Sequence, residues 1–136
     1  MARILVIDDR EDIRDLVKLM LTQSGHEVVL AVDGDDGLQR FQAQPIDLVI
    51  CDVFMPRKEG LETVKELRRM AADLPIITMS GNPSGNDADP DFRGPDFLRM
   101  TAMVGATATI AKPFKRDQLL ALVASCLAGE SARSAS

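Results

Sequence analysis

Short apolar runs alternate with longer amphipathic stretches along this chain, and no other feature restricts its fold as strongly. The short runs predict strands at residues 3–7, 27–31, 46–51, 75–79 and 106–111. In the longer stretches apolar residues recur every three or four positions, which predicts helices at residues 12–24, 35–43, 59–71, 96–104 and 116–127. Strands and helices that alternate in this way form parallel sheets with right-handed crossovers. The predicted fold class is therefore α/β, a doubly wound (βα)5 five-stranded parallel sheet with helices on both faces.

Each predicted helix is expected to bury one face against the sheet. The first helix would use Ile13, Leu16, Val17, Met20 and Leu21 for this face, and Gly25 is placed to end it.

The chain has 136 residues, which suits one domain at residues 1–128, followed by a disordered polar tail at 129–136. No apolar stretch reaches the roughly 18 residues that a membrane span needs, and the N-terminus turns acidic too early for a secretory signal. We therefore expect a cytoplasmic protein without membrane contact. The net charge of −5 argues against nucleic-acid binding by this chain, although Lys65, Arg68 and Arg69 could form a local basic patch.

Cys51 and Cys126 lie in apolar runs and lack a Cys or His at metal-ligand spacing, so each is expected to be a reduced, packed thiol. The single histidine, His26, follows Gly25 and is expected to be a surface turn residue. One histidine leaves no material for a His-based metal site.

Polar side chains follow four of the five predicted strands. In an open parallel sheet, ligands bind beyond the carboxyl ends of the strands, so these side chains should converge on one edge. They are Asp8 and Asp9 after the first strand, Asp52 after the third, Ser80 after the fourth and Lys112 after the fifth.

Three neighbouring carboxylates repel one another, and a hard cation such as Mg²⁺ resolves this repulsion by taking oxygen ligands. An aspartate beside such an ion can act as a nucleophile toward phosphorus and form an aspartyl phosphate. A lysine and a hydroxyl would then neutralise or donate to the phosphoryl oxygens.

Each of these residues alone has a simpler explanation. Asp8 and Asp9 could cap the helix that follows them, and Asp52 could form an Asx turn. Ser80 could be a turn residue and Lys112 a solvated cation. Their conjunction at the correct strand ends favours one shared site.

Four motifs carry a family resemblance. The segments ILVIDD, ICDVFMP with Gly60 four residues after its proline, ITMSG and KPF resemble, in this order, the receiver domain of bacterial two-component response regulators. The resemblance covers about residues 2–127, nearly the whole chain. It implies a flavodoxin-like sheet with strand order 2-1-3-4-5.

The resemblance also implies roles at the phosphoryl site. Asp52 matches the phospho-accepting aspartate, Ser80 the hydroxyl residue that moves on activation, and Lys112 the invariant lysine. The backbone N–H groups of Val53 and Gly81 would contact the phosphoryl oxygens.

For the metal, the resemblance implies Mg²⁺, with Mn²⁺ as an alternative. Asp9 would be a direct ligand, Asp8 would act at least partly through water, and Asp52 and the backbone carbonyl of Phe54 would complete the protein ligands. The bond before Pro113 is expected to be a cis peptide.

Two features depart from the family pattern. Thr109 stands at the switch position where many receivers have Tyr or Phe, so the usual coupling of an aromatic ring to Ser80 is absent. The loop at 80–94 exceeds the usual length of about 2–6 residues and is expected to be functional or mobile, altering the partner-binding face.

An acidic spacing inside this loop resembles a calcium loop, formed by Asp87, Asp89 and Asp91. Phe92 and Leu98 stand where Gly and Glu are required, so the calcium interpretation fails.

The leading functional prediction is a single-domain response regulator, with no output domain after Ala128. It would take a phosphoryl group from a sensor histidine kinase or a phosphotransfer protein, then change its binding to a downstream protein or relay the phosphate. It would not be an enzyme beyond its own phosphorylation and dephosphorylation.

Two alternatives stay open. One is an aspartate-nucleophile phosphatase, although haloacid-dehalogenase-like enzymes have D-x-D after the first strand, unlike D-D-R-E-D here. The other is an interaction module whose site no longer works.

Overall fold

The computed structural model describes residues 2–52, 59–80, 105–111 and 114–128. Within them, five strands form one parallel sheet in the order β2-β1-β3-β4-β5. The strands are β1 (Arg3–Ile7), β2 (Glu27–Ala31), β3 (Leu48–Asp52), β4 (Ile76–Ser80) and β5 (Ala108–Ala111). The helices are α1 (Glu11–Gln23), α2 (Gly34–Ala43), α3 (Glu59–Met70) and α5 (Arg116–Leu127). The predicted α/β class and the strand order 2-1-3-4-5 are confirmed.

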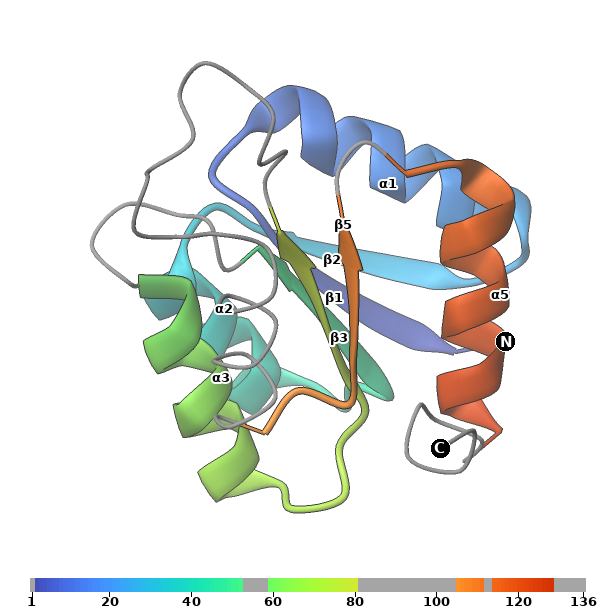
Figure 1. Ribbon diagram of the computed structural model, residues 1–136. Helices are drawn as coiled ribbons and strands as arrows, with labels where there is room; N and C mark the ends of the chain where they lie inside the picture. The colour runs from blue at the N-terminus through green and yellow to red at the C-terminus, as the bar shows by residue number, and fades with distance from the viewer. Residues whose placement is uncertain (1, 53–58, 81–104, 112–113, 129–136) are drawn as a thin grey trace, which may run out of the picture.

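The helices form a layer on each face of the sheet (Figure 1). Helices α1 and α5 cover one face, and α2 and α3 cover the other. Because β3 lies between these layers, all five of its residues are buried. This double cover explains why the central strands are continuous apolar runs in the sequence.

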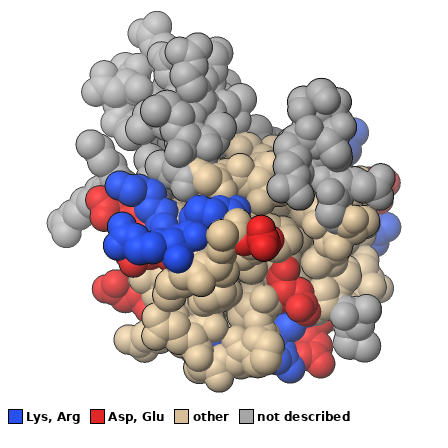
Figure 2. Space-filling view, turned by 90° about the horizontal axis from the view of Figure 1, so that it is seen from below, with Lys and Arg blue, Asp and Glu red and all other residues tan. Residues whose placement is uncertain are grey.

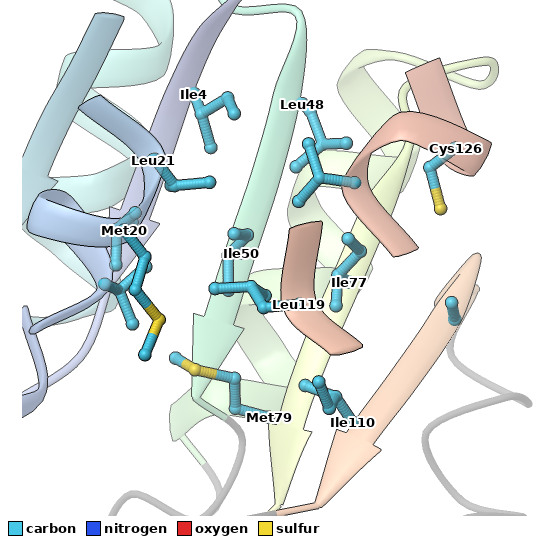
Figure 3. Packing of buried hydrophobic residues seen from close by; sticks show 14 of the residues in the cluster. Ile4, Met20, Leu21, Leu48, Ile50, Ile77, Met79, Ile110, Leu119 and Cys126 are labelled. Carbon is cyan, nitrogen blue, oxygen red and sulfur yellow. The ribbon is translucent and has the colours of Figure 1, made fainter. Parts of the chain in front are cut away.

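The larger part of the core lies under α1 and α5 (Figure 3). There Met20 and Leu21 of α1 and Leu119 of α5 pack on side chains from the sheet, among them Ile4, Ile50, Ile77 and Met79. Burying side chains of this size contributes about 1.5–3 kcal/mol each, which makes this layer the main source of stability.

The second layer depends on a close approach between α2 and β1. A Cβ atom placed on Gly37 would lie 2.4 Å from Cδ1 of Ile7, so the helix backbone packs directly on that side chain. Ile7 is fully buried and immediately precedes Asp8. The small residue therefore lets α2 pack tightly beside the end of β1.

Three strands begin later than predicted, of which β4 differs by one residue, since it begins at Ile76 instead of residue 75. Strand β3 begins at Leu48 instead of residue 46, and β5 begins at Ala108 instead of residue 106. The side chains just before them accept backbone hydrogen bonds: Asp47 Oδ2 from the N–H of Arg3 at 2.8 Å, and Thr107 Oγ1 from the N–H of Ile76 at 3.0 Å. A side-chain oxygen thus accepts the backbone N–H of the neighbouring strand just before β3 and β5, and each of these strands starts two residues later than predicted.

The expectation that Leu16 belongs to the buried face of the first helix is wrong. Its side chain is 43% exposed, whereas Val17, Met20 and Leu21 are buried. Successive residues of a helix differ by about 100° in direction, so Leu16 lies at the margin of the stripe that Val17 centres. Leu19 is also exposed, at 55%, which leaves two leucines on the outer side of α1.

Both cysteines are buried and unbridged, as expected for packed thiols. Burial raises the pKa of the Cys126 thiol above its usual value. A buried thiol with a raised pKa is a poor nucleophile, so Cys126 acts as a small apolar core residue.

Lys and Arg side chains gather on the lower face of the molecule, over the region of α3 (Figure 2). Of the three cations considered for a basic patch, Arg69 pairs with Glu66 at 3.1 Å and Arg68 donates to the backbone carbonyls of Ala71, Ala72 and Gly105. Two of the three cations are therefore engaged within the domain.

Several predicted features lie outside the described residues. They are the helix at 96–104, the loop at 80–94 beyond Ser80, and the tail at 129–136.

Candidate functional site

Three carboxylates meet at the carboxyl edge of the sheet. Asp8, Asp9 and Asp52 each offer one oxygen, and these oxygens lie within 4.8 Å of one another. Asp8 and Asp52 are almost fully buried, at 0% and 2% exposure, whereas Asp9 is exposed. We call this group the acidic trio.

Strand register brings the acidic trio together. Strands β1 and β3 are parallel neighbours, and Ile7 pairs with Cys51. The next residue on each strand is Asp8 and Asp52, so the two carboxylates leave the sheet side by side. This placement was predicted from the strand ends in the sequence, and the structure shows the three side chains in one group.

Neighbouring residues in the described part of the chain hold both the backbone and the carboxylate of Asp8 through hydrogen bonds. Its N–H donates to the carbonyl of Ala31 at 3.2 Å, and its Oδ1 accepts the N–H of Arg10 at 2.9 Å. Its carbonyl accepts Nη1 of Arg14 at 2.7 Å. The end of β2, which shows no functional residue in the sequence, therefore contributes through the backbone of Ala31.

Arg14 was missed by the sequence interpretation. A signal for it exists, because a long side chain in the first turns of a helix lies over the chain N-terminal to its own Cα. Arg14 is half-buried and reaches Asp8, three residues before the first residue of the helix, in this way.

The alternative in which Asp8 and Asp9 cap α1 is not realised. The N-cap residue is Arg10, and its side chain makes no capping hydrogen bond. The Asp8 carboxylate accepts from Arg10 ahead of the first helical turn, and the Asp9 carboxylate lies in the acidic trio.

The guanidinium of Arg10, next to the acidic trio in the sequence, binds Asp12. Its Nε and Nη2 donate to the Asp12 carboxylate at 3.2 and 3.0 Å. This hydrogen bond is the largest cause that raises the pKa of Arg10 and lowers the pKa of Asp12 from their usual values. Asp8 and Asp9 raise the Arg10 pKa further through their charge, which places that cation within electrostatic reach of the trio.

Strands β4 and β5 contribute a pair of hydroxyl groups that lie within the sheet, before the carboxyl ends of the two strands. Thr78 and Thr109 are register partners, and their Oγ1 atoms lie 2.9 Å apart in a hydrogen bond. The predicted switch position is thus occupied by a hydroxyl bonded across the sheet. Ser80 is the last residue of β4, two positions beyond Thr78, and its side chain lies outside the described part of the structure.

The other predicted site residues lie outside the described residues. These are Val53, Phe54, Gly81, Lys112 and Pro113, so their predicted roles stay predictions.

The donor set of the trio fits a hard divalent cation. All three groups are carboxylates, oxygen ligands of the kind that Mg²⁺ and Mn²⁺ prefer. Two of them are buried beside each other, and a cation between them would relieve the repulsion that burial intensifies. Exposed Asp9 leaves one side of the group open to water and to an incoming ligand.

Fold and site together define a class of protein: a doubly wound parallel domain with an acidic site at the carboxyl edge of its two central strands. The chain belongs to the response regulator receiver domain family, whose sequence profile matches residues 4–124.

Relatives of known name agree with this membership. The transcriptional regulatory protein DltR of Streptococcus agalactiae is 34% identical over 121 residues, which cover 89% of this chain and 50% of that protein. The CAI-1 autoinducer sensor kinase/phosphatase CqsS of Vibrio cholerae is 38% identical over 125 residues, covering 90% of this chain and 17% of that protein. The chain therefore spans about half the length of the first of these relatives and less of the second.

A solved structure of similar length shares the fold. The chemotaxis protein CheY4 of Vibrio cholerae superposes with a TM-score of 0.80 at 31% identity, covering 93% of this chain and 98% of that one.

Among the helices that the structure describes, none is long and apolar enough to cross a membrane.

Proposed function

We propose that this domain accepts a phosphoryl group on Asp52, in a reaction that depends on Mg²⁺. The observation that carries the proposal is the acidic trio, whose oxygens lie within 4.8 Å of one another. Asp52 ends a fully buried strand, so its carboxylate is held on a rigid base. Receiver-family membership supports the same chemistry.

The proposed transfer moves a phosphoryl group from a histidine nitrogen to an oxygen of Asp52. A carboxylate oxygen of Asp52 attacks the phosphorus of a phosphohistidine, a P–O bond forms, and the P–N bond breaks. The imidazole leaves with the electron pair and takes a proton from solvent. Later a water molecule attacks phosphorus, the P–O bond to Asp52 breaks, and the carboxylate and inorganic phosphate are restored. The domain would carry out no other reaction.

Asp8, Asp9 and Asp52 would hold the metal ion, together with the Phe54 carbonyl that the family resemblance implies. The bound ion supplies charge neutralisation for the carboxylates and the phosphoryl oxygens. Ser80 and Lys112 are proposed to donate to the same oxygens.

The phosphoryl donor would be a sensor histidine kinase or a phosphotransfer protein. Helix α1 begins two residues after Asp9, and it carries two exposed leucines, Leu16 and Leu19. A donor that seats its histidine near Asp52 would contact this helix. Kinase activity in the related CqsS supports a partner of this kind.

The output would be a change in binding to a downstream protein, or onward relay of the phosphate. The buried, unbridged thiols Cys51 and Cys126 fit a reducing compartment such as the cytoplasm, where we place the protein.

Incubation with acetyl phosphate and Mg²⁺, followed by intact-protein mass spectrometry, tests the proposal. We expect one phosphoryl group on the wild-type chain and none on Asp52→Asn. Asp73→Asn is the matched control, because it removes an exposed aspartate in the turn before β4, at the opposite edge of the sheet, and should label normally.

Phosphate on the Asp52→Asn variant would contradict the assignment. Sustained turnover of acetyl phosphate without a labelled protein would favour a phosphatase, and neither labelling nor turnover would favour an inert interaction module.

A further inference from the structure

Arg14 reaches back from α1 to the peptide that joins Asp8 to Asp9. Its Nη1 donates to the Asp8 carbonyl oxygen at 2.7 Å, a length typical of a strong charge-assisted hydrogen bond. The side chain is half-buried, and its own backbone N–H donates to the carbonyl of Arg10 at 3.1 Å within the helix. Arg14 is therefore a residue of α1 whose side chain binds the backbone of the segment that precedes the helix.

The Asp8 carbonyl that Arg14 binds belongs to the peptide unit that precedes Asp9. A peptide unit is planar, so the Asp8 carbonyl and the Asp9 nitrogen turn together. Asp8 is already restrained by the Ala31 carbonyl and by the N–H of Arg10. Asp9 has no burial to hold it, so the orientation of this peptide plane is what directs its carboxylate toward the trio.

We propose that Arg14 is a positioning residue for the cation site: its guanidinium holds the Asp8–Asp9 peptide so that the exposed Asp9 carboxylate stays with the buried Asp8 and Asp52. The inference rests on the proposed Mg²⁺ site and adds a residue that contacts no ligand itself.

Two effects of Arg14 on a bound cation oppose each other. Its positive charge repels a cation, and its hydrogen bond keeps the ligands in place. The guanidinium is partly in water, which screens the repulsion, whereas the hydrogen bond acts directly on the backbone of two ligands. Outer partners that orient metal ligands typically account for about 10–100-fold in affinity. We therefore expect the positioning effect to be the larger one.

Arg10 provides a matched control for the charge. It lies beside the same aspartates and is also an arginine, but its guanidinium binds Asp12 and leaves the Asp8 carbonyl alone. Arg10→Met removes one positive charge near the trio and keeps the Arg14 hydrogen bond. Arg14→Met removes one positive charge and the hydrogen bond together.

Titration of the whole chain with MgCl₂, followed by isothermal calorimetry without any phosphodonor, tests the inference. We expect Arg14→Met to weaken Mg²⁺ binding about tenfold, and Arg10→Met to bind as tightly as the wild type or slightly more tightly. Arg14→Lys should weaken binding by a smaller factor, because a lysine keeps the charge but offers a point donor instead of a planar fork.

Equal or tighter Mg²⁺ binding by Arg14→Met would show that charge repulsion dominates and would overturn the inference alone. No Mg²⁺ binding by the wild type would instead overturn the proposed metal site, and the inference with it. Circular dichroism checks the fold of each variant. Should Arg14→Met fail to fold, Arg14→Lys decides the question, and wild-type affinity for it would overturn the inference.

Discussion

His26 joins the start of β1 to the turn before β2. Its Nδ1 accepts the backbone N–H of Ala2 at 3.2 Å, and the ring is half-buried. His26 therefore lies at the predicted turn, but it is half-buried and hydrogen-bonded to Ala2 instead of lying free on the surface. Burial is the larger cause that lowers the pKa of His26 below its usual value of 6.5, and the nearby amino-terminal charge lowers it further.

This lowered pKa predicts a loss of stability on mild acidification. The unfolded chain takes up a proton at His26 near pH 6.5, whereas the folded chain resists it, so the unfolded state binds more protons. The contribution is present above the unfolded pKa and is lost as pH falls through the folded pKa. We expect the urea midpoint to fall between about pH 7 and pH 5, where carboxylates are still mainly ionised.

His26→Asn is the informative variant, because its side-chain oxygen can accept the Ala2 N–H but does not titrate. Its urea midpoint should change less than that of the wild type over the same pH range. An equally steep change in this variant would assign the pH dependence to other groups.

At the scale of elements, one side chain joins α3 to the approach of β5. The guanidinium of Arg68 donates to the carbonyls of Ala71 and Ala72 at 3.2 and 2.7 Å and to the carbonyl of Gly105 at 2.7 Å. Gly105 has a φ of +107°, and a Cβ there would lie 3.0 Å from Cγ of Arg68. Glycine thus permits both the backbone conformation and the close contact.

Replacing Arg68 with lysine should reduce the free energy of unfolding by about 2 kcal/mol, because a lysine cannot reach several carbonyls with a planar fork. Urea unfolding measures the change. The same replacement at Arg69 is the control. Its ion pair with Glu66 is exposed, so the change should stay within about 0.5 kcal/mol. Equal effects at the two positions would show that the carbonyl contacts of Arg68 contribute little.

At the scale of the whole molecule, negative charge is concentrated at the carboxyl edge of the sheet. The chain has a net charge of −5, and three of its carboxylates share one small volume at the carboxyl edge. Folding creates this concentration, since Asp52 lies far along the sequence from the adjacent Asp8 and Asp9. A cation that binds the trio therefore binds the folded state alone and stabilises it by linkage.

Mg²⁺ at ten times its dissociation constant should stabilise the wild type by about 1.4 kcal/mol, or about 5 °C in Tm. Asp9→Ala should remove most of this shift. Asp73→Ala makes the same charge change in the turn before β4, at the opposite edge, and should keep it. Differential scanning calorimetry with and without Mg²⁺ measures all three. An unchanged shift in Asp9→Ala would contradict a role for Asp9 as a ligand.

The sequence by itself determined the succession of elements, the parallel class and the edge to which the acids belong. These follow from local periodicity and from the handedness of crossovers, which depend little on detailed packing. Asp8, Asp9 and Asp52 were predicted as one group for this reason, and their oxygens do lie together.

Only the tertiary structure decided which side chains at the margins of the helices are exposed and which ones make contacts between elements. The exposure of Leu16 depends on how α1 lies on the sheet, because the side chain of Leu16 points about 100° away from that of its buried neighbour Val17. The hydrogen bonds from Arg68 to Gly105, 37 residues away, depend on how α3 and the segment before β5 pack against each other. The two partners of the Arg68 contact are far apart in the sequence, so no local pattern predicts it.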